Sequence, residues 1–132
     1  MATFTLIEQP VTGDEIPDPA TNPPRNPGDD LLIIERVLVD RKGKDRGKLT
    51  VRGTIVRKIG LAGDALWSFQ GNINIFGKGA INTQGVFQFG DLASGMTFAI
   101  VGGTGKYNKA HGTATAVRPA PTAPVELTFR VL

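Results

Sequence analysis

Hydrophobic and polar residues alternate along most of this chain. The clearest run covers residues 65–75, where Trp67, Phe69 and Ile73 fall on one face and mostly Ser, Gln and Asn fall on the other. Such alternation is typical of β-strands, whose successive side chains point to opposite faces of a sheet. The sequence therefore predicts eight strands, over residues 3–8, 31–40, 48–59, 65–75, 79–89, 97–102, 112–118 and 125–131.

Most connections between these strands are short and contain glycine, as at residues 40–47, 61–64, 76–78 and 91–95. Short connections make neighbouring strands antiparallel. Eight such strands close into a barrel whose interior holds side chains or one small ligand. We therefore expect residues 1–132 to form one all-β domain, an eight-stranded antiparallel, calycin-like barrel with a central apolar cavity. A two-sheet sandwich has the same strand count, and periodicity does not separate the two.

Residues 9–30 break the alternation, because six of the nine prolines lie there. Proline cannot donate to a strand ladder, so we expect an irregular loop. Loops of this length are uncommon in compact domains unless they have a function. Two interpretations stay open: a lid over one end of the barrel, with Ile16 as its apolar anchor, or a plain connector.

Composition narrows the chemistry. The chain has no cysteine and only one histidine, His111, so we expect no metal site, whether zinc or haem iron. Its net charge of +3 comes from 15 basic and 12 acidic residues, too weak and mixed to indicate a nucleic-acid partner. We see neither a membrane-length apolar segment nor a secretory leader, and expect a cytoplasmic protein.

The stretch GGTGK at residues 102–106 suggests a phosphate-binding loop but fails the pattern. A P-loop needs glycine where Ile100 stands and Ser or Thr where Tyr107 stands, and a dinucleotide fingerprint needs glycine at Asn108. We interpret the stretch as a tight turn after a strand.

The same turn resembles a signature of the allene oxide cyclase and dirigent superfamily. Residues 98–107 (FAIVGGTGKY) followed by 110–112 (AHG) are similar to its GGTG, aromatic and A-x-G elements. Weaker matches follow the superfamily order: residues 5–8 (TLIE) before a proline-containing loop, 28–40 opening with GDDL, and the glycine-punctuated 79–89. The resemblance therefore extends over nearly the whole chain.

This resemblance implies an eight-stranded barrel that uses no cofactor. Plant allene oxide cyclases close a fatty-acid-derived epoxide into a cyclopentenone. Short bacterial barrels of the spirotetronate-cyclase type, which catalyse Diels–Alder cycloadditions in polyketide pathways, are more similar in size. Relatives are dimers or trimers, and the apolar outer face formed by Leu31, Ile33, Val37 and Val39 is a candidate homodimer or homotrimer interface.

Glu8 is the candidate catalytic residue. Phe4, Leu6 and Glu8 share one face of the first strand. If that face points inward, burial raises the pKa of Glu8 and makes it an acid–base or hydrogen-bonding group. Resemblance to the strand-one glutamate of the cyclases supports this role. The alternative is an exposed glutamate at a strand end.

Candidate substrate contacts come from apolar residues that would face the same interior. They are Phe4, Leu6, Trp67, Phe69, Phe87 and Met96, although each could equally be packing. Glu35 and Arg36 interrupt an apolar strand, and since neighbours point to opposite faces, one of them faces inward or packs at an interface. An inward Arg36 would orient a tetronate or carboxylate, whereas an outward Arg36 would be a surface ion pair.

Together these features predict a cyclase or isomerase that folds a flexible hydrophobic small molecule, derived from a polyketide or fatty acid, inside the barrel. An intramolecular Diels–Alder cycloaddition in natural-product biosynthesis is one such reaction. The alternatives are a non-catalytic barrel that binds lipophilic ligands and a structural module with a solid core.

Overall fold

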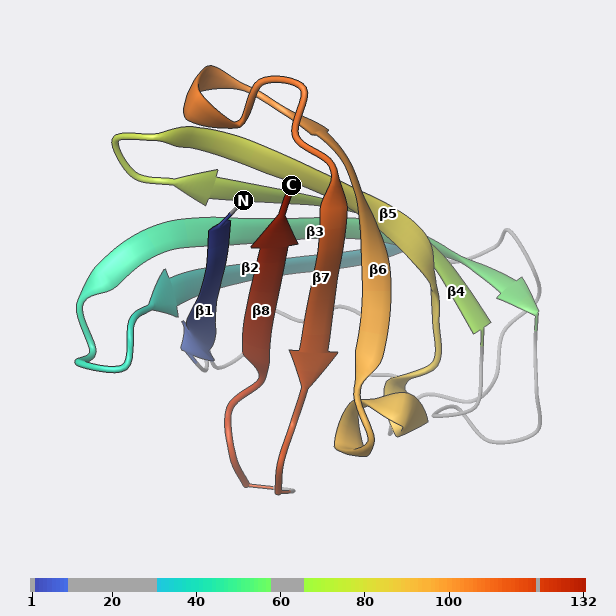
Figure 1. Cartoon of the computed structure of the whole chain (residues 1–132). Coiled ribbons are helices and arrows are strands. Elements are labelled where there is room, and N and C mark those ends of the chain that lie inside the picture. Colours follow the sequence, from blue (N-terminus) through green and yellow to red (C-terminus); the bar gives the residue numbers. More distant parts are fainter. Residues whose placement is uncertain (1, 10–30, 58–65, 121) are drawn as a thin grey trace.

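The computed structural model describes all residues except 1, 10–30, 58–65 and 121 (Figure 1). Eight strands and two short 3-10 helices make up this described part. They are β1 (Ala2–Gln9), β2 (Leu31–Val39), β3 (Asp45–Arg57), β4 (Leu66–Ile75), β5 (Gly79–Phe87), η2 (Phe89–Ala93), β6 (Met96–Gly103), η3 (Gly105–Tyr107), β7 (Gly112–Val117) and β8 (Glu126–Val131).

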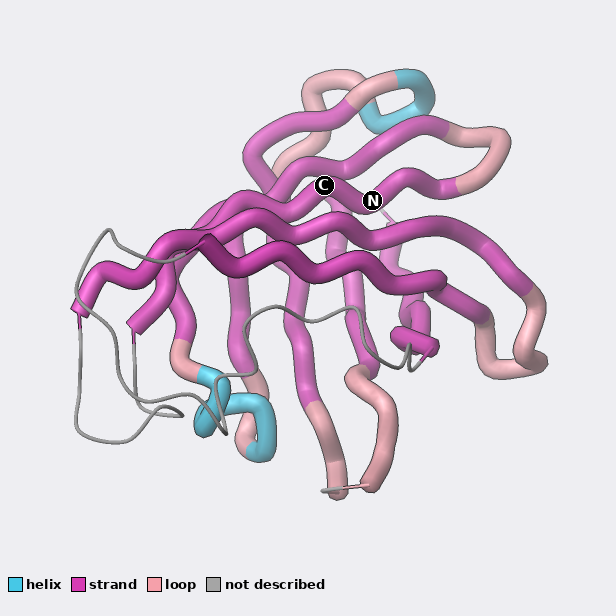
Figure 2. The backbone as a smooth tube through the Cα atoms, turned by 180° about the vertical axis from the view of Figure 1, so that it is seen from behind, coloured by secondary structure: helices cyan, strands magenta, loops and turns pink. Residues whose placement is uncertain are grey.

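The eight strands form one closed barrel in chain order. Every neighbouring pair is antiparallel, and β8 pairs with β1 from Ala2↔Val131 to Ile7↔Glu126. Figure 2 shows the same ring of strands from behind. The predicted eight-stranded antiparallel barrel is confirmed, and the sandwich alternative is wrong.

Strand ends differ slightly from the sequence prediction. β3 begins at Asp45 rather than Lys48, because the β2–β3 turn is tight enough for Leu38 to pair with Gly47. β5 ends at Phe87 rather than Phe89, since the chain turns into η2 there. The GGTGK stretch ends β6 and enters the three-residue η3, followed by strand β7, which agrees with a tight turn.

One end of the barrel is filled by its own side chains. Tyr107, which follows the GGTGK turn, is buried against a core that includes the fully buried Leu38, Ile81 and Phe129. The Phe4 ring stacks on Phe129 with centroids 5.1 Å apart and lies 6.4 Å from the Tyr107 ring. We call this the filled end; Figure 1 shows η3 beside the β4–β5 turn there.

The turn at the filled end depends on a close approach of two backbones. Thr104 N–H donates to Ala80 O at 2.9 Å, and Lys106 N–H donates to Lys78 O at 2.7 Å. Between these bonds, Gly79 has φ +131°, and a methyl group there would run into the carbonyl oxygen of Thr104. Only glycine fits both the backbone conformation and the space.

We predict that Gly79→Ala destabilises the fold by about 2–5 kcal/mol, from backbone strain and a forced shift of the Thr104 turn. Gly43→Ala is the matched control, because Gly43 also has positive φ (+81°) but faces open space. It should cost about 1 kcal/mol. Urea unfolding of both variants tests this, and equal losses would contradict the close approach.

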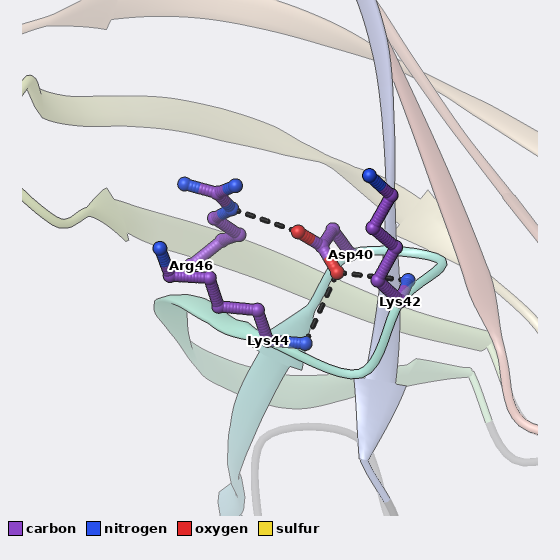
Figure 3. A network of polar contacts seen from close by, with 4 residues as sticks. All are labelled: Asp40, Lys42, Lys44 and Arg46. Atoms are coloured by element: carbon purple, nitrogen blue, oxygen red, sulfur yellow. Dashed lines mark hydrogen bonds and ion pairs between the residues drawn. The ribbon is translucent and has the colours of Figure 1, made fainter.

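Asp40 organises the exposed β2–β3 turn (Figure 3). Its Oδ1 accepts the backbone N–H groups of Lys42 at 2.9 Å and Lys44 at 3.0 Å, and its Oδ2 accepts Arg46 Nε at 2.9 Å. These hydrogen bonds, that of Lys44 foremost, lower the pKa of Asp40. The basic residues here are exposed and belong to a solvated turn.

We predict that Asp40→Ala lowers the Tm near neutral pH. Because the pKa of Asp40 is lower in the folded state, its stabilisation is complete above the unfolded pKa, near 3.8. It is lost as the pH falls through the folded pKa. The Tm difference from wild type should therefore shrink in strong acid. Asp91→Ala, an exposed aspartate in η2, serves as the control and should change the Tm little. A pH-independent Tm difference for Asp40→Ala would count against this account.

The predicted lid, with Ile16, lies outside the described residues. On the predicted oligomer face, Ile33 is 44% exposed and Val37 and Val39 are half-buried, while the side chain of Leu31 is not described. The oligomeric state stays a prediction.

Candidate functional site

Apolar residues inside the barrel form two clusters that both contact Val51. The first occupies the filled end. The second, which we call the aromatic cluster, is built on the opposite ends of the same strands. It consists of Ile34, Ile55, Trp67, Phe69 and Phe87, with Val51, Met96 and Phe98 packed against it.

Glu8 lies on the interior face of β1. It follows the buried Leu6 by two residues and is the Cα partner of the fully buried Leu38. On its other side, Glu8 N–H donates to the carbonyl of buried Val125 at 2.9 Å. Glu8 is therefore half-buried in the barrel wall near the end of β1, with Leu38 and Val125 beside it.

This position changes the acidity of Glu8. Burial raises its pKa from 4.5 to about 7, although the positive charges of Arg36 and Arg118 act in the opposite direction. Burial dominates because a carboxylate loses more hydration energy than these charges return. Near neutral pH the group is therefore present in both protonation states, which suits an acid–base or hydrogen-bonding role.

Arg36 is the inward member of the pair that the sequence left open. It is 9% exposed, pairs with buried Leu49 and lies two residues from Leu38, whereas Glu35 is exposed. Its Nη1 donates to the carbonyl oxygen of Glu35 at 2.8 Å. Since Leu38 is opposite Glu8, Arg36 is the diagonal neighbour of Glu8 on the same face. The interpretation of Arg36 as an outward ion pair is therefore wrong.

The aromatic cluster contains three of the predicted substrate contacts on adjacent strands. Trp67 pairs with Phe87, and the Phe69 ring makes edge contacts with Phe87 and Phe98 at centroid distances of 5.4 and 4.6 Å. Met96 packs against the same cluster. Phe4 and Leu6 belong instead with the filled end. The structure thus separates the predicted contacts into two groups.

Trp67 is buried with its polar atom unpaired. The residue is 3% exposed, and its indole Nε1 has no hydrogen-bond partner within the part of the chain that the structure describes. An unsatisfied buried donor costs about 1–3 kcal/mol.

Three inward or nearby residues were missed by the sequence analysis. Phe98 contacts Phe69, Thr83 is a buried polar residue opposite Gly71, and Arg118 lowers the pKa of Glu8. Alternation with Ile100 could have placed Phe98 on the inner face, and alternation with Ile81 could have placed Thr83 there. Nothing in the local sequence around Arg118 signals its electrostatic effect on Glu8.

The described residues offer neither a metal-binding cluster nor a membrane-crossing helix. These residues contain no group of three or more His, Cys, Asp or Glu side chains that could hold a metal ion, and His111 is exposed. Nor do they include a helix of the length and hydropathy needed to cross a bilayer.

Residues 15–129 match the sequence profile of the family described as the allene oxide cyclase barrel like domain. The chain belongs to this family. The match confirms the resemblance carried by the GGTG turn, and this allene oxide cyclase-like barrel is consistent with the strand order described above.

Solved structures with the same fold include three informative ones, each about one-fifth identical in sequence. A pyocyanin demethylase is 20% identical with a TM-score of 0.71, over 99% of this chain and 100% of that one. AbnU, described as an exo-specific intermolecular Diels-Alderase, is 17% identical with a TM-score of 0.68, over 99% and 98%. A heme-binding cyclase of neoabyssomicin biosynthesis is 21% identical with a TM-score of 0.68, over 100% of this chain and 65% of that one. No curated protein matches this chain.

We predict that Glu8→Gln stabilises the protein above about pH 7. Folded Glu8 keeps a proton that unfolded Glu8 releases, so wild-type stability falls as the pH rises from about 4.5 to about 7. Glutamine removes this loss, which amounts to about 3 kcal/mol at most. Near pH 4.5 the two proteins should be similarly stable.

Denaturant unfolding at both pH values measures the effect. Glu35→Gln is the matched control, since that carboxyl group is exposed on the neighbouring strand. If the Glu8 and Glu35 variants show the same pH dependence as wild type, the carboxyl group of Glu8 is not buried.

Proposed function

We propose that this allene oxide cyclase-like barrel is a cofactor-free cyclase or isomerase that folds a flexible hydrophobic small molecule inside its apolar interior. The substrate is polyketide- or fatty-acid-derived, and an intramolecular Diels–Alder cycloaddition is the leading reaction. The observation that carries the proposal is the ionisable pair Glu8 and Arg36 on the inner wall of an apolar barrel.

The pair is costly to the fold and is therefore informative. Arg36 is buried opposite Leu49, Glu8 stands opposite Leu38, and burial raises the pKa of Glu8. A barrel evolved only as a solid module would have an apolar pair at these positions, because buried charges seldom add stability. Charge interactions are also stronger in such surroundings than in water. The pair is thus placed to act on a bound molecule.

The chemistry follows from these two groups and the shape of the barrel. Arg36 would orient an acidic or enolic end of the substrate, and protonated Glu8 would donate a hydrogen bond to a carbonyl oxygen as electron density builds there. The aromatic cluster would hold the apolar remainder in a reactive conformer. Proximity of this kind is worth roughly 7–11 kcal/mol in well-oriented intramolecular reactions.

Family and neighbours support this reaction class. The family takes its description from a cyclase, and two of the solved structures are described as a Diels-Alderase and a cyclase that catalyses a cycloaddition. Their low identity relates the folds alone. The assignment of Glu8 and Arg36 therefore depends on this chain's own geometry.

The competing function is a non-catalytic barrel that binds a lipophilic compound. It would need the apolar interior but no acid–base group. We further propose that the protein acts on a small molecule as a cytoplasmic homodimer or homotrimer.

The decisive experiment measures conversion of a linear polyene tetronate by the purified protein. We predict that Glu8→Gln lowers kcat by up to about 10²–10³, because an amide is a poorer hydrogen-bond donor to the carbonyl oxygen than a carboxylic acid. The wild-type rate should change with an inflection near pH 7, where Glu8 titrates. Trp67→Ala should raise KM by enlarging the site. Glu35→Gln is the control and should keep the wild-type rate.

Two other outcomes are informative. Tight binding of the polyene without conversion would support the binding barrel. Conversion at wild-type rates by both Glu8→Gln and Trp67→Ala would remove the site assignment.

A further inference from the structure

We propose that the indole N–H of Trp67 binds a neutral oxygen acceptor of the occupant, so that the ligand is an apolar molecule with a ketone, ester or ether oxygen at this point. This inference rests on the proposed function, because it requires a molecule inside the barrel. It adds a second polar anchor to the ligand, apart from Glu8 and Arg36.

The described residues that contact Trp67 are apolar. On β4 it pairs with Ile55 of β3 and Phe87 of β5, and it packs in one cluster with Ile34 and Phe69. None of these side chains can accept a hydrogen bond. Among the described residues, the Nε1 atom accordingly has no partner.

Among the described residues, Ser68 and Thr83 are polar side chains on β4 and β5 that do not reach this N–H. Ser68 follows Trp67 directly but is exposed on the outer face. Thr83 is buried on the inner face, yet it lies four residues along β5 from Phe87, the partner of Trp67. At about 3.3 Å per residue, its Cα is roughly 13 Å further along the strand.

An indole N–H is a donor only, and buried tryptophans usually give it a partner. Phenylalanine would fill similar space in this cluster without a polar atom. The structure has therefore placed a donor in a dry environment where its hydration is already lost. When a ligand brings an acceptor to this position, the hydrogen bond forms with no further cost for desolvating the indole N–H.

The surroundings also select the kind of acceptor. A carboxylate beside Trp67 would be buried among apolar residues without a counter-charge, which is strongly unfavourable. The inward cation Arg36 stands on β2, two residues beyond Ile34 of this cluster and towards the filled end. A neutral oxygen fits the Trp67 position, whereas an acidic or enolic group fits the Glu8 and Arg36 position. The occupant therefore carries its two kinds of oxygen at separate points.

The chain offers a direct probe, since Trp67 is its only tryptophan. In ¹⁵N-labelled protein a single indole N–H cross-peak reports on this atom. We suggest titration with 1-tetralone and with tetralin, which have the same ring skeleton and differ only in a ketone. Tetralone should move the cross-peak downfield, as expected for a hydrogen-bonded N–H, whereas tetralin should produce only ring-current changes.

The variant Trp67→Phe completes a thermodynamic cycle, in which two ligands are compared in two proteins. In wild type, the preference for tetralone over tetralin should exceed the preference in Trp67→Phe by about tenfold, the usual value of one neutral hydrogen bond. The backbone amide of Gly85, beside Phe69, can follow binding in both proteins. If Trp67→Phe does not fold, the wild-type cross-peak comparison still decides the question.

The failures are distinguishable. If both compounds bind with the same preference in both proteins and the cross-peak does not move downfield, the anchor is wrong while the apolar site stands. If neither compound binds either protein, the proposed ligand-binding interior is itself wrong, and the anchor falls with it.

Discussion

Closure of the ladder between β1 and β8 is the constraint on which the rest of the structure depends. Because these strands pair from Ala2↔Val131 to Ile7↔Glu126, no strand of the barrel is left as an edge, and every side chain is assigned to the inside or the outside. A slip of one residue would bring Thr5 and Ile7 inward and expel Leu6 and Glu8. The hydrophobic side chains of β1 thus enforce the burial of its carboxyl group. The register that buries the apolar residues of β1 therefore also keeps Glu8 on the inner face, although burial of its carboxyl group is unfavourable.

The alternation of residue types was enough to predict the strands, because a two-residue period is a direct expression of a pleated strand with one buried face, and the short connections added their antiparallel order. It was not enough to orient Glu35 and Arg36. Alternation shows that the two point in opposite directions, but both are charged, so hydrophobicity does not identify the inner one. The decision lies in the register with β3, where Arg36 stands opposite buried Leu49. The same limitation left the orientation of Glu8 open until Leu38 was found beside it.

Other features of the site depend on contacts between residues far apart in the chain. The effect of Arg118 on Glu8 joins residues on β1 and beyond β7, which only the closed ring brings within electrostatic range. The aromatic residues were recognisable as a group, but not their division: Phe4 packs near Tyr107, while Trp67 and Phe69 lie in the other cluster. This division follows from the direction in which each strand runs. The sequence likewise does not show that the indole N–H of Trp67 lacks a partner among the described residues, because this depends on which side chains of other strands surround it.

The filled end has a kinetic consequence for any occupant. If a molecule binds in the interior as proposed, Tyr107, Phe129 and Leu38 block its passage through the filled end, so it would have to enter and leave at the end of the aromatic cluster. A flexible linear substrate can enter by such a route segment by segment, but a rigid cyclised product must leave as one unit. Catalysis by ring formation would therefore make exit slower than entry, and the shape of the unblocked end would govern how quickly one barrel completes successive rounds.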